Sequence, residues 1–346
     1  MSKLFEWLKT TKTKWWVDSA VPVEIEEGIR RGSLGVTTNP YLLRKSLYEH
    51  KESWQSILKN IPLSLKDDEK VQSIMKEIIT GIAQTLFPIY KDSNGELGYV
   101  CAQVSPKMQS NYEDMLVMAE RFHSWAPNIA VKLPATSAAL DVMAKCAGLG
   151  ITTVITVGFS VAQSVAAAEK YRQALSEMKK KTPGKKPGRC FSVIMVGRLD
   201  DYLRDVARDS NASVPESDIV QAGIAVTKKT YQIYQENNYE AILLVSGFRS
   251  EKQPMSLLGA DMLLSLSPDI CRKLEQQENK YSESIDSPID QDVIRRLSTM
   301  KEFNKAYETE GLLKEDFIGY GPVQRTLTQF DDAGWSRIAD FELGSR

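Results

Sequence analysis

Short apolar runs recur along the sequence, and each is followed by a longer segment with a helical pattern. We predict eight strands from these runs, at residues 14–18, 34–38, 99–104, 128–133, 151–157, 191–196, 241–246 and 261–266. Strands that alternate with helices favour a parallel sheet built with right-handed crossovers. Eight such units are the number that closes a (β/α)8 barrel, which typically takes about 250 residues. In a chain of 346 residues, we therefore predict an α/β fold, a (β/α)8 TIM barrel with additional helices.

The additional helices fall at two places in the predicted single barrel domain, which spans residues 1–346. One is a helical insertion at about 41–90, directly after Asn39 and Pro40, which are typical of a helix N-cap and first turn. The other is a set of C-terminal helices at about 288–342. The alternative fold is an open doubly wound sheet. Because no GxGxxG sequence follows a predicted strand, a dinucleotide-binding sheet is disfavoured, and the barrel is the better interpretation.

The composition argues against several classes of partner. Lysine and arginine total 44 against 45 aspartates and glutamates, so we expect no bulk attraction to nucleic acid or to a membrane. No 18-residue apolar run occurs, and the first 14 residues lack the long apolar core of a signal peptide, so we expect a cytoplasmic protein. A basic stretch at 179–189 could contact nucleic acid. Its two prolines, two glycines and lack of aromatic residues favour a solvated surface loop.

Cysteine and histidine are too few for several familiar kinds of site. The four cysteines are widely scattered without a CxxC pair, which is typical of reduced thiols and not of a disulfide frame or a zinc site. Two histidines leave little from which to build a Ser-His-Asp triad or a multi-histidine metal centre. Catalysis would therefore depend on Lys, Asp, Glu, Gln, Thr or Tyr, and we expect no metal.

The predicted fourth strand ends in a lysine. Lys132 follows a run of apolar or small residues and stands two residues before Pro134, and lysine is among the residue types least often fully buried. One interpretation is that Lys132 ends an edge strand and extends into solvent. The other is that an apolar pocket encloses it. Burial then disfavours the ammonium form, and the free amine can attack a carbonyl to form a Schiff base.

Polar side chains follow most of the predicted strands. They are Asp18, Thr37, Thr38, Asn39, Gln103, Lys132, Thr156, Arg198 and Arg249. Because the active site of such a barrel lies at the C-terminal ends of its strands, all of them should face one mouth. Singly, each has a simpler explanation, such as a helix cap, a strand former or a surface ion pair. Together they suit carbonyl chemistry on an anionic, phosphorylated sugar, in which lysine forms the imine, aspartate moves protons and arginine binds phosphate.

The sequence resembles the transaldolase family along most of its length. The matching stretches, in the family's order, are VDSA at 17–20, GVTTNPYLL at 35–43, IAVKLPAT at 129–136, TTVITVGFSVAQS at 152–164, VGRLDD at 196–201, GFRS at 247–250 and GADMLLSLSP at 259–268. This resemblance implies a class I (Schiff-base) barrel that needs no metal or organic cofactor. Members of the family are transferases of the pentose phosphate pathway that move a dihydroxyacetone unit between sugar phosphates, or release it as an aldolase does.

The resemblance implies roles for four catalytic positions. Lys132 matches the Schiff-base lysine, and Asp18 matches the acid/base that takes the proton of the C4 hydroxyl during carbon–carbon cleavage. Thr156 matches the threonine that helps to position the catalytic water. Gln103 stands where transaldolases carry a glutamate, and an amide can hold a water but cannot take its proton.

The same resemblance implies four substrate-binding positions. Thr37 and Asn39 match residues that hold the bound three-carbon unit, and Arg198 and Arg249 match the phosphate-binding arginines. The expected partners are therefore phosphorylated sugars, and a homo-oligomer is left open.

Other positions depart from the family's pattern. Met195 replaces the tyrosine that accompanies glutamine in the aldolase-type members, and Val154 replaces an asparagine that hydrogen-bonds the substrate. Val193 and Gly247 replace serines; each follows another serine, and at Ser192 a shift of one residue would restore the match. The catalytic residues are thus kept, while the neutral hydrogen-bonding residues around them change.

We predict a transaldolase-like enzyme that transfers a dihydroxyacetone unit between sugar phosphates through a lysine Schiff base. One alternative is a related Schiff-base aldolase with an altered substrate, which the changes at Gln103, Val154 and Val193 favour. The other is a non-catalytic sugar-phosphate-binding barrel, which would need the two arginines but not Lys132.

Overall fold

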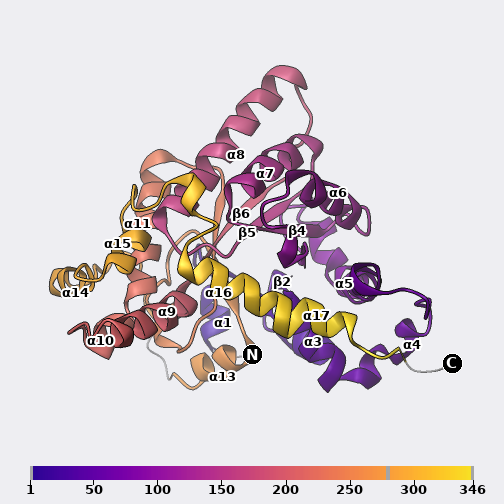
Figure 1. Cartoon of the computed structure of the whole chain (residues 1–346), viewed down its shortest axis with the longest axis horizontal. Coiled ribbons are helices and arrows are strands. Elements are labelled where there is room, and N and C mark those ends of the chain that lie inside the picture. The colour runs from indigo at the N-terminus through magenta and orange to yellow at the C-terminus, as the bar shows by residue number, and fades with distance from the viewer. Residues whose placement is uncertain (1–2, 278–280, 344–346) are drawn as a thin grey trace.

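The computed structural model describes residues 3–277 and 281–343, and its centre is a closed barrel of eight parallel strands (Figure 1). The strands are β1 (Lys14–Asp18), β2 (Gly35–Thr37), β3 (Tyr99–Gln103), β4 (Ile129–Pro134), β5 (Thr153–Thr156), β6 (Cys190–Met195), β7 (Ile242–Ser246) and β8 (Leu263–Leu266). Each strand pairs with its neighbours in sequence, and β8 closes on β1. The predicted barrel is confirmed. Residues 1–2, 278–280 and 344–346 of the predicted domain lie outside the described residues.

Every predicted strand overlaps an observed one, and no end differs by more than two residues. β5 stops before Val157, whose positive φ of 52° ends the extended conformation. β4 continues through Pro134, so Lys132 lies inside the strand and not at its end. Because the barrel is closed, β4 has a paired neighbour on each side. The interpretation of Lys132 as the end of a solvent-exposed edge strand is therefore wrong.

Aromatic side chains fill the N-terminal half of the barrel interior. Trp16 on β1 lies 5.0 Å from Phe191 on β6, and Tyr99 on β3 lies 6.0 Å from Phe191, measured between ring centroids. These strands are not neighbours, so the rings meet across the inside of the barrel. Gly35 is required there, because a Cβ at this position would lie 2.7 Å from the indole of Trp16. The interior is thus packed at this end, and polar side chains gather at the other.

Helices follow the strands and surround the barrel (Figure 1). The larger ones are α2 (Pro22–Arg30), α3 (Pro40–Glu49), α5 (Asp67–Asp92), α6 (Tyr112–His123), α7 (Ser137–Leu149), α8 (Val161–Lys181), α9 (Val196–Asp209), α11 (Ala222–Asn237) and α13 (Pro268–Glu275); α1 (Lys3–Leu8) precedes β1. The predicted cap Asn39 accepts a hydrogen bond from the N–H of Leu42 at 3.0 Å, and Ser160 accepts one from Gln163 at 3.1 Å. Both bonds satisfy N–H groups that a helix start leaves unpaired.

The two regions outside the basic barrel pattern, residues 41–90 and 288–342, each contain several helices. Residues 41–90 comprise most of α3, η1 (Lys51–Trp54), α4 (Gln55–Leu58) and most of α5. Residues 288–342 comprise α14 (Gln291–Leu297), α15 (Lys301–Tyr307), η3 (Lys314–Asp316), α16 (Gly321–Phe330), the π-helical turn η4 (Asp331–Trp335) and α17 (Ser336–Ala339). Both regions are thus built from several separate helices joined by short connections. The remaining short elements are η2 (Pro106–Met108), α10 (Glu216–Ile219) and α12 (Lys252–Met255).

The C-terminal segment formed by α16, η4 and α17 runs across the barrel (Figure 1). Gly334 permits close packing on α3, because a Cβ there would lie 2.7 Å from the backbone of Pro40. The indole N–H of Trp335 donates to Asp68 on α5 at 2.6 Å. On the opposite side, Arg325 pairs with Asp205 of α9 at 2.6 Å. The segment is therefore held on both sides of the barrel mouth.

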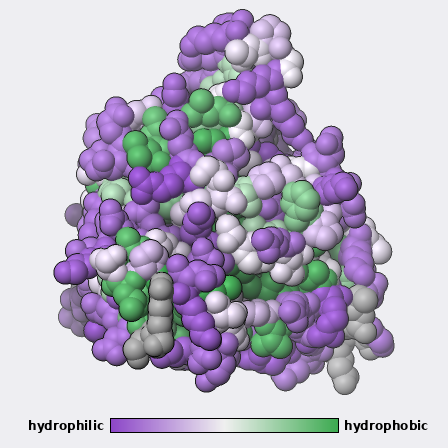
Figure 2. Space-filling model, turned by 90° about the vertical axis from the view of Figure 1, so that its right-hand side faces the viewer, coloured by the Kyte–Doolittle hydropathy of each residue, from purple (hydrophilic) through white to green (hydrophobic). Residues whose placement is uncertain are grey.

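The basic stretch at 179–189 lies on the surface. Its first three lysines belong to the last turn of α8, where positive charge interacts favourably with the helix dipole. This end of α8 projects from the top of Figure 1, and Figure 2 shows the projection as mainly hydrophilic. Among the described residues, no helix is long and apolar enough to cross a membrane.

Candidate active site

Lys132 lies inside the barrel with its amine buried. Its exposed fraction is 5%, and Nζ donates a hydrogen bond to the backbone carbonyl of Thr38 at 3.1 Å. The strand register places Gln103 of β3 beside Lys132 on one side and Val154 of β5 beside it on the other. Register partners in parallel strands share a face and lie about 5 Å apart. The amine is therefore enclosed between one amide and one apolar neighbour.

The carboxylate of Asp18 lies in the same mouth and belongs to a hydrogen-bonded chain of side chains. The hydroxyl of Thr37 donates to Oδ1 of Asp18 at 2.6 Å and lies 2.6 Å from the hydroxyl of Ser265. Burial raises the pKa of Asp18, while the hydrogen bond from Thr37 and the positive charge of Lys132 act in the opposite direction. Ser265 was not among the predicted site residues. Its position inside the eighth apolar run gave no sign of a polar contact.

Two of the predicted catalytic residues carry buried polar atoms without a partner. These are Oε1 of Gln103 and Oγ1 of Thr156, neither of which has a hydrogen-bond partner among the described residues. Buried polar groups are almost always paired, so such atoms call for a water or a ligand. The register places Thr156 beside Pro134, two residues nearer the mouth than Lys132. Both atoms are thus available to hold a water or a substrate hydroxyl.

The inward face of β6 is apolar. Phe191 faces the interior, so Val193 and Met195 face it too, because alternate residues of a strand point to one side. Ser192 points outward, where it interacts with Tyr234 of α11. The shift of one residue that would have placed Ser192 in the site is therefore wrong. On β7, Ser246 pairs in register with Met195 and is the serine that faces inward.

Asn39 has a structural role at the rim. Its side-chain oxygen caps α3, and its Nδ2 has no acceptor among the described residues. The amide group therefore remains able to donate to a ligand while its oxygen holds the helix.

Arg198 stands in the first turn of α9, under the C-terminal segment. Its guanidinium donates to the side-chain oxygen of Gln329 and lies 5.3 Å from the ring centroid of Phe330. Burial lowers the pKa of Arg198, and repulsion from Arg249 adds to this effect, whereas Asp18 opposes it. Two arginines and one carboxylate thus share this side of the mouth. Two like charges on one side of the mouth favour an anionic ligand between them.

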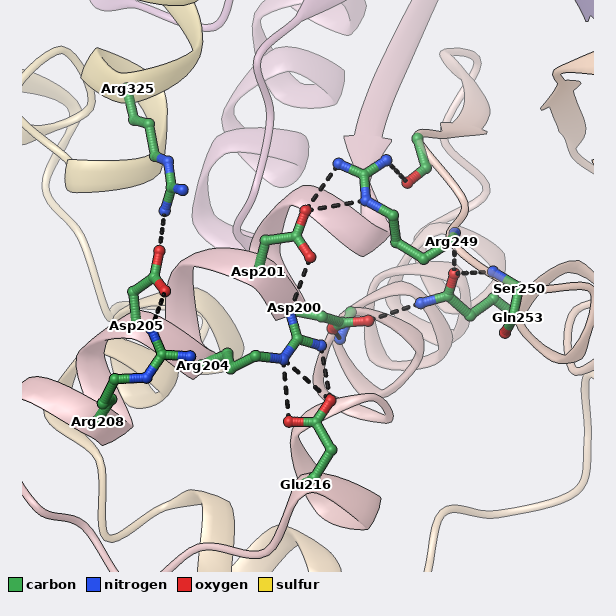
Figure 3. Close-up of polar contacts among 12 residues, drawn as sticks. Asp200, Asp201, Arg204, Asp205, Arg208, Glu216, Arg249, Ser250, Gln253 and Arg325 are labelled. Carbon is green, nitrogen blue, oxygen red and sulfur yellow. Dashed lines mark hydrogen bonds and ion pairs between the residues drawn. The ribbon is translucent and has the colours of Figure 1, made fainter.

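Arg249 is tied to α9 by a carboxylate that sequence reasoning missed. Nε and Nη2 of Arg249 contact Oδ2 of Asp201 at 2.9 and 2.8 Å, and Nη1 donates to the carbonyl of Gly247 at 3.1 Å (Figure 3). Asp201 also pairs with Arg204 at 2.8 Å. The VGRLDD motif contains this aspartate, which could have been read as a partner of a nearby arginine. Close packing brings the two segments together: a Cβ on Gly197 would lie 2.5 Å from Cγ of Arg249.

A buried carboxylate supports the loop that carries Arg249. Asp200 accepts hydrogen bonds from the N–H of Gly223 at 2.8 Å and from Nε2 of Gln253 at 2.6 Å (Figure 3). Gln253 in turn accepts from the backbone N–H of Arg249 at 2.7 Å. The backbone position of Arg249 therefore depends on a chain of contacts that begins at Asp200.

The pH dependence of stability should report the burial of Asp200. Burial raises the pKa of this carboxyl from 3.8 to about 7. Because the folded pKa exceeds the unfolded one, the contribution of Asp200 to the free energy of unfolding is lost as the pH rises from about 4 to about 7. A shift of this size corresponds to at most roughly 4 kcal/mol.

We expect Asp200→Asn to flatten the decrease in the free energy of unfolding between about pH 5 and pH 8, measured by urea unfolding at both values. The exposed Asp205 on the same helix provides the control, and Asp205→Asn should leave the difference unchanged. If the free energy of unfolding decreased equally between these pH values in Asp200→Asn and in the unchanged protein, the carboxyl of Asp200 would not titrate in this range.

Among residues 3–277 and 281–343, no group of three or more histidine, cysteine or carboxylate side chains is placed to hold a metal ion. The site brings together the amine of Lys132, the carboxylate of Asp18, the guanidinium groups of Arg198 and Arg249, and several neutral donors and acceptors.

Comparison with known proteins identifies a similar family and similar individual chains. The model of the family described as transaldolase/fructose-6-phosphate aldolase matches residues 15–319. A protein named transaldolase 2 from Streptomyces coelicolor is 26% identical over 213 residues, which cover 59% of this chain and 55% of the relative. A transaldolase from Campylobacter jejuni is 26% identical over 252 residues, which cover 69% of this chain and 73% of the relative. The chain thus spans about half the length of the Streptomyces relative.

Proposed function

Because the chain belongs to the transaldolase/fructose-6-phosphate aldolase family, we propose that it is a class I transaldolase-like enzyme. It moves a three-carbon ketone unit, dihydroxyacetone by resemblance, from a ketose phosphate to an aldose phosphate, and it needs no organic cofactor. The observation that carries this proposal is the buried amine of Lys132, which lies close enough to the carboxylate of Asp18 to oppose the effect of burial on its pKa. An amine and a carboxylate in one enclosed mouth are the minimum set for imine chemistry.

In the first step, Nζ of Lys132 attacks the carbonyl carbon of the ketose. A carbon–nitrogen bond forms, the carbonyl oxygen leaves as water, and a protonated imine remains. The enclosed setting of Lys132 favours this step, because a buried amine is held in one position and is shielded from bulk water.

Cleavage then requires a base beside the C4 hydroxyl. Asp18 takes that proton, the oxygen–hydrogen electron pair becomes the carbonyl of the departing aldehyde, and the C3–C4 bonding pair moves toward the imine to give an enamine. Thr37 holds Oδ1 of Asp18 at 2.6 Å, so the carboxylate is oriented before substrate arrives.

The enamine has two outcomes. It attacks an acceptor aldehyde, in which case Asp18 returns its proton to the new hydroxyl, or it takes a proton and the ketone is released by water. We expect Oε1 of Gln103 and Oγ1 of Thr156 to hold that water, since both atoms are buried and without a partner among the described residues. An amide cannot take a proton from the water. Gln103 is therefore expected to affect the ratio of transferred to released product, and this ratio can be measured.

The two arginines should determine affinity for phosphate. We expect Arg198→Ala and Arg249→Ala each to raise KM for fructose 6-phosphate about 10- to 100-fold, since charge-assisted hydrogen bonds contribute roughly 1.5–3 kcal/mol. KM for an unphosphorylated donor should change little. Arg208 is an exposed arginine on the same helix, paired with Asp205, and Arg208→Ala provides the matched control. If KM for the phosphorylated donor did not rise in either variant, the arginines would not form the phosphate site.

The proposal is tested by borohydride trapping with fructose 6-phosphate, followed by intact-mass and peptide-mass analysis. The expected result is one adduct of the three-carbon unit on Lys132. Product analysis with and without an acceptor aldose phosphate then separates transfer from release. A folded protein that forms no adduct on Lys132 would refute the proposed Schiff base.

A further inference from the structure

Two consecutive residues of the C-terminal segment contact Arg198 at the mouth. Nη1 of Arg198 donates to Oε1 of Gln329, and Cζ of the guanidinium lies 5.3 Å from the ring centroid of the buried Phe330. Among the described residues, the guanidinium makes no other hydrogen bond. Because arginine carries five N–H donors, most of them stay available to a ligand while Gln329 and Phe330 hold the group in place.

The chemistry of arginine fixes the orientation of the Gln329 amide. Arg198 has no acceptor, so the atom of Gln329 that faces it must be the oxygen Oε1. Both N–H donors of Nε2 are then left without an acceptor among the residues that the structure describes. The side chain of Gln329 is exposed, so a ligand can reach Nε2 from solvent. Gln329 thus presents unused donors beside those of Arg198.

Contacts on both sides keep Gln329 at the mouth. One turn earlier on α16, Arg325 pairs with Asp205 of α9 at 2.6 Å. Beyond Gln329, the π-helical turn η4 leads to Trp335, which donates to Asp68 of α5 at 2.6 Å. Helical turns of this kind are rare and often occur at functional sites. The position of Gln329 is therefore fixed by the fold before any ligand binds.

The two arginines differ in how many of their donors are free. Arg249 uses Nε, Nη1 and Nη2 on Asp201 and Gly247, whereas Arg198 uses Nη1 alone. An anion attracted by both charges therefore finds most of its free N–H donors on Arg198 and on the neighbouring amide of Gln329. The family model matches residues 15–319, so Gln329 lies beyond the part of the chain to which the resemblance assigns roles.

We propose that Gln329 is a third phosphate-binding residue. Its Nε2 donates to the phosphate group of the sugar bound at Arg198, while Oε1 keeps its bond with the guanidinium. This inference rests on the proposed phosphate site of Arg198 and Arg249. A phosphate monoester offers three strong acceptor oxygens, and the amide adds a donor for them without adding charge. No contact of the structure has to break, so the C-terminal segment contributes directly to the selection of phosphorylated over free sugars.

The test compares fructose 6-phosphate with fructose as donors at one fixed acceptor concentration. Gln329→Ala removes a hydrogen bond to a charged group, so the ratio of kcat/KM for fructose 6-phosphate to that for fructose should fall about tenfold. Gln329→Lys supplies donors but no acceptor and should restore most of the ratio. Thr328 is the exposed neighbour on α16, and Thr328→Ala, the matched control, should leave the ratio unchanged.

The variants separate donation to phosphate from orientation of Arg198. A ratio that falls in Gln329→Ala and recovers in Gln329→Lys would support the inference. A ratio that does not change in Gln329→Ala would overturn it. If the ratio fell as far in Gln329→Lys as in Gln329→Ala, Gln329 would act only by holding Arg198 through Oε1, and the proposed donation would be wrong.

Two further measurements separate this inference from the proposed function. Borohydride trapping with dihydroxyacetone, which carries no phosphate, tests the Schiff base at Lys132 without the phosphate site. An adduct on Lys132 together with an unchanged ratio in Gln329→Ala would overturn the inference and leave the Schiff base intact. A folded protein without that adduct, or an Arg198→Ala variant with an unchanged KM for fructose 6-phosphate, would overturn the proposed function or its phosphate site, and the inference with it.

Discussion

Replacing Lys132 with methionine is expected to lower kcat/KM for aldol cleavage or transfer by at least about 10³-fold and to abolish the borohydride-trapped adduct. Loss of a nucleophile removes the covalent route, and such losses exceed those of single hydrogen-bonding groups. Methionine keeps the length of the side chain and suits an apolar setting. Since Lys132 is 5% exposed, the replacement also removes a buried polar group, and the fold should be retained.

A second lysine of the same barrel provides the control. Lys14 lies on β1 at the opposite end of the interior, and its Nζ donates to the carbonyl of Thr11 at 2.9 Å. Lys14→Met should keep both the adduct and the activity. An adduct that persisted in Lys132→Met at the mass expected for the ketone would place the reaction on another lysine. A variant that lost the adduct but kept its function in cells would favour the sugar-phosphate-binding barrel.

The strands and the inward face of the site could be predicted to different degrees. The apolar runs located all eight strands, because a buried parallel strand needs a continuous apolar segment. The direction of a single side chain depends on the register of its strand, and an apolar run does not reveal that register. The contact between Phe191 and Trp16 across the barrel shows that Val193, and not Ser192, faces the interior. A one-residue change of register reverses every side chain of a strand.

Partners from distant parts of the chain were beyond local patterns. Ser265 contacts Thr37 across 228 positions of sequence, and only closure of β8 on β1 brings them together. From the sequence alone, Asp201 resembles any carboxylate on the surface of a helix. The loop after β7 brings Arg249 to it in the folded protein. The contact between Arg198 and Gln329 depends likewise on the C-terminal segment crossing the mouth. Motif spacing predicted which residues gather there, and tertiary structure determined what each one contacts.

Replacing Asp18 with asparagine is expected to separate imine formation from carbon–carbon cleavage. The amide cannot take the C4 proton, so kcat for cleavage should decrease about 10²- to 10⁴-fold, the usual contribution of a general base. The amine of Lys132 remains, and the adduct trapped by borohydride should still form with a ketone donor. Burial raises the pKa of Asp18, so the charged carboxylate costs folding free energy at neutral pH, and the variant should be no less stable than the unchanged protein.

The pH dependence of kcat/KM tests whether Asp18 is the base. A base must be deprotonated, so kcat/KM should fall as the pH drops through the pKa of Asp18, at a higher pH than for an ordinary carboxyl because burial raises that pKa. The hydrogen bond from Thr37 lowers it, so Thr37→Val should move the acid limb to still higher pH. Asp18→Asn should remove the limb altogether. A limb that stayed in place in both variants would mean that another group takes the proton, and Asp18 would then serve only to orient the hydroxyls of Thr37 and Ser265.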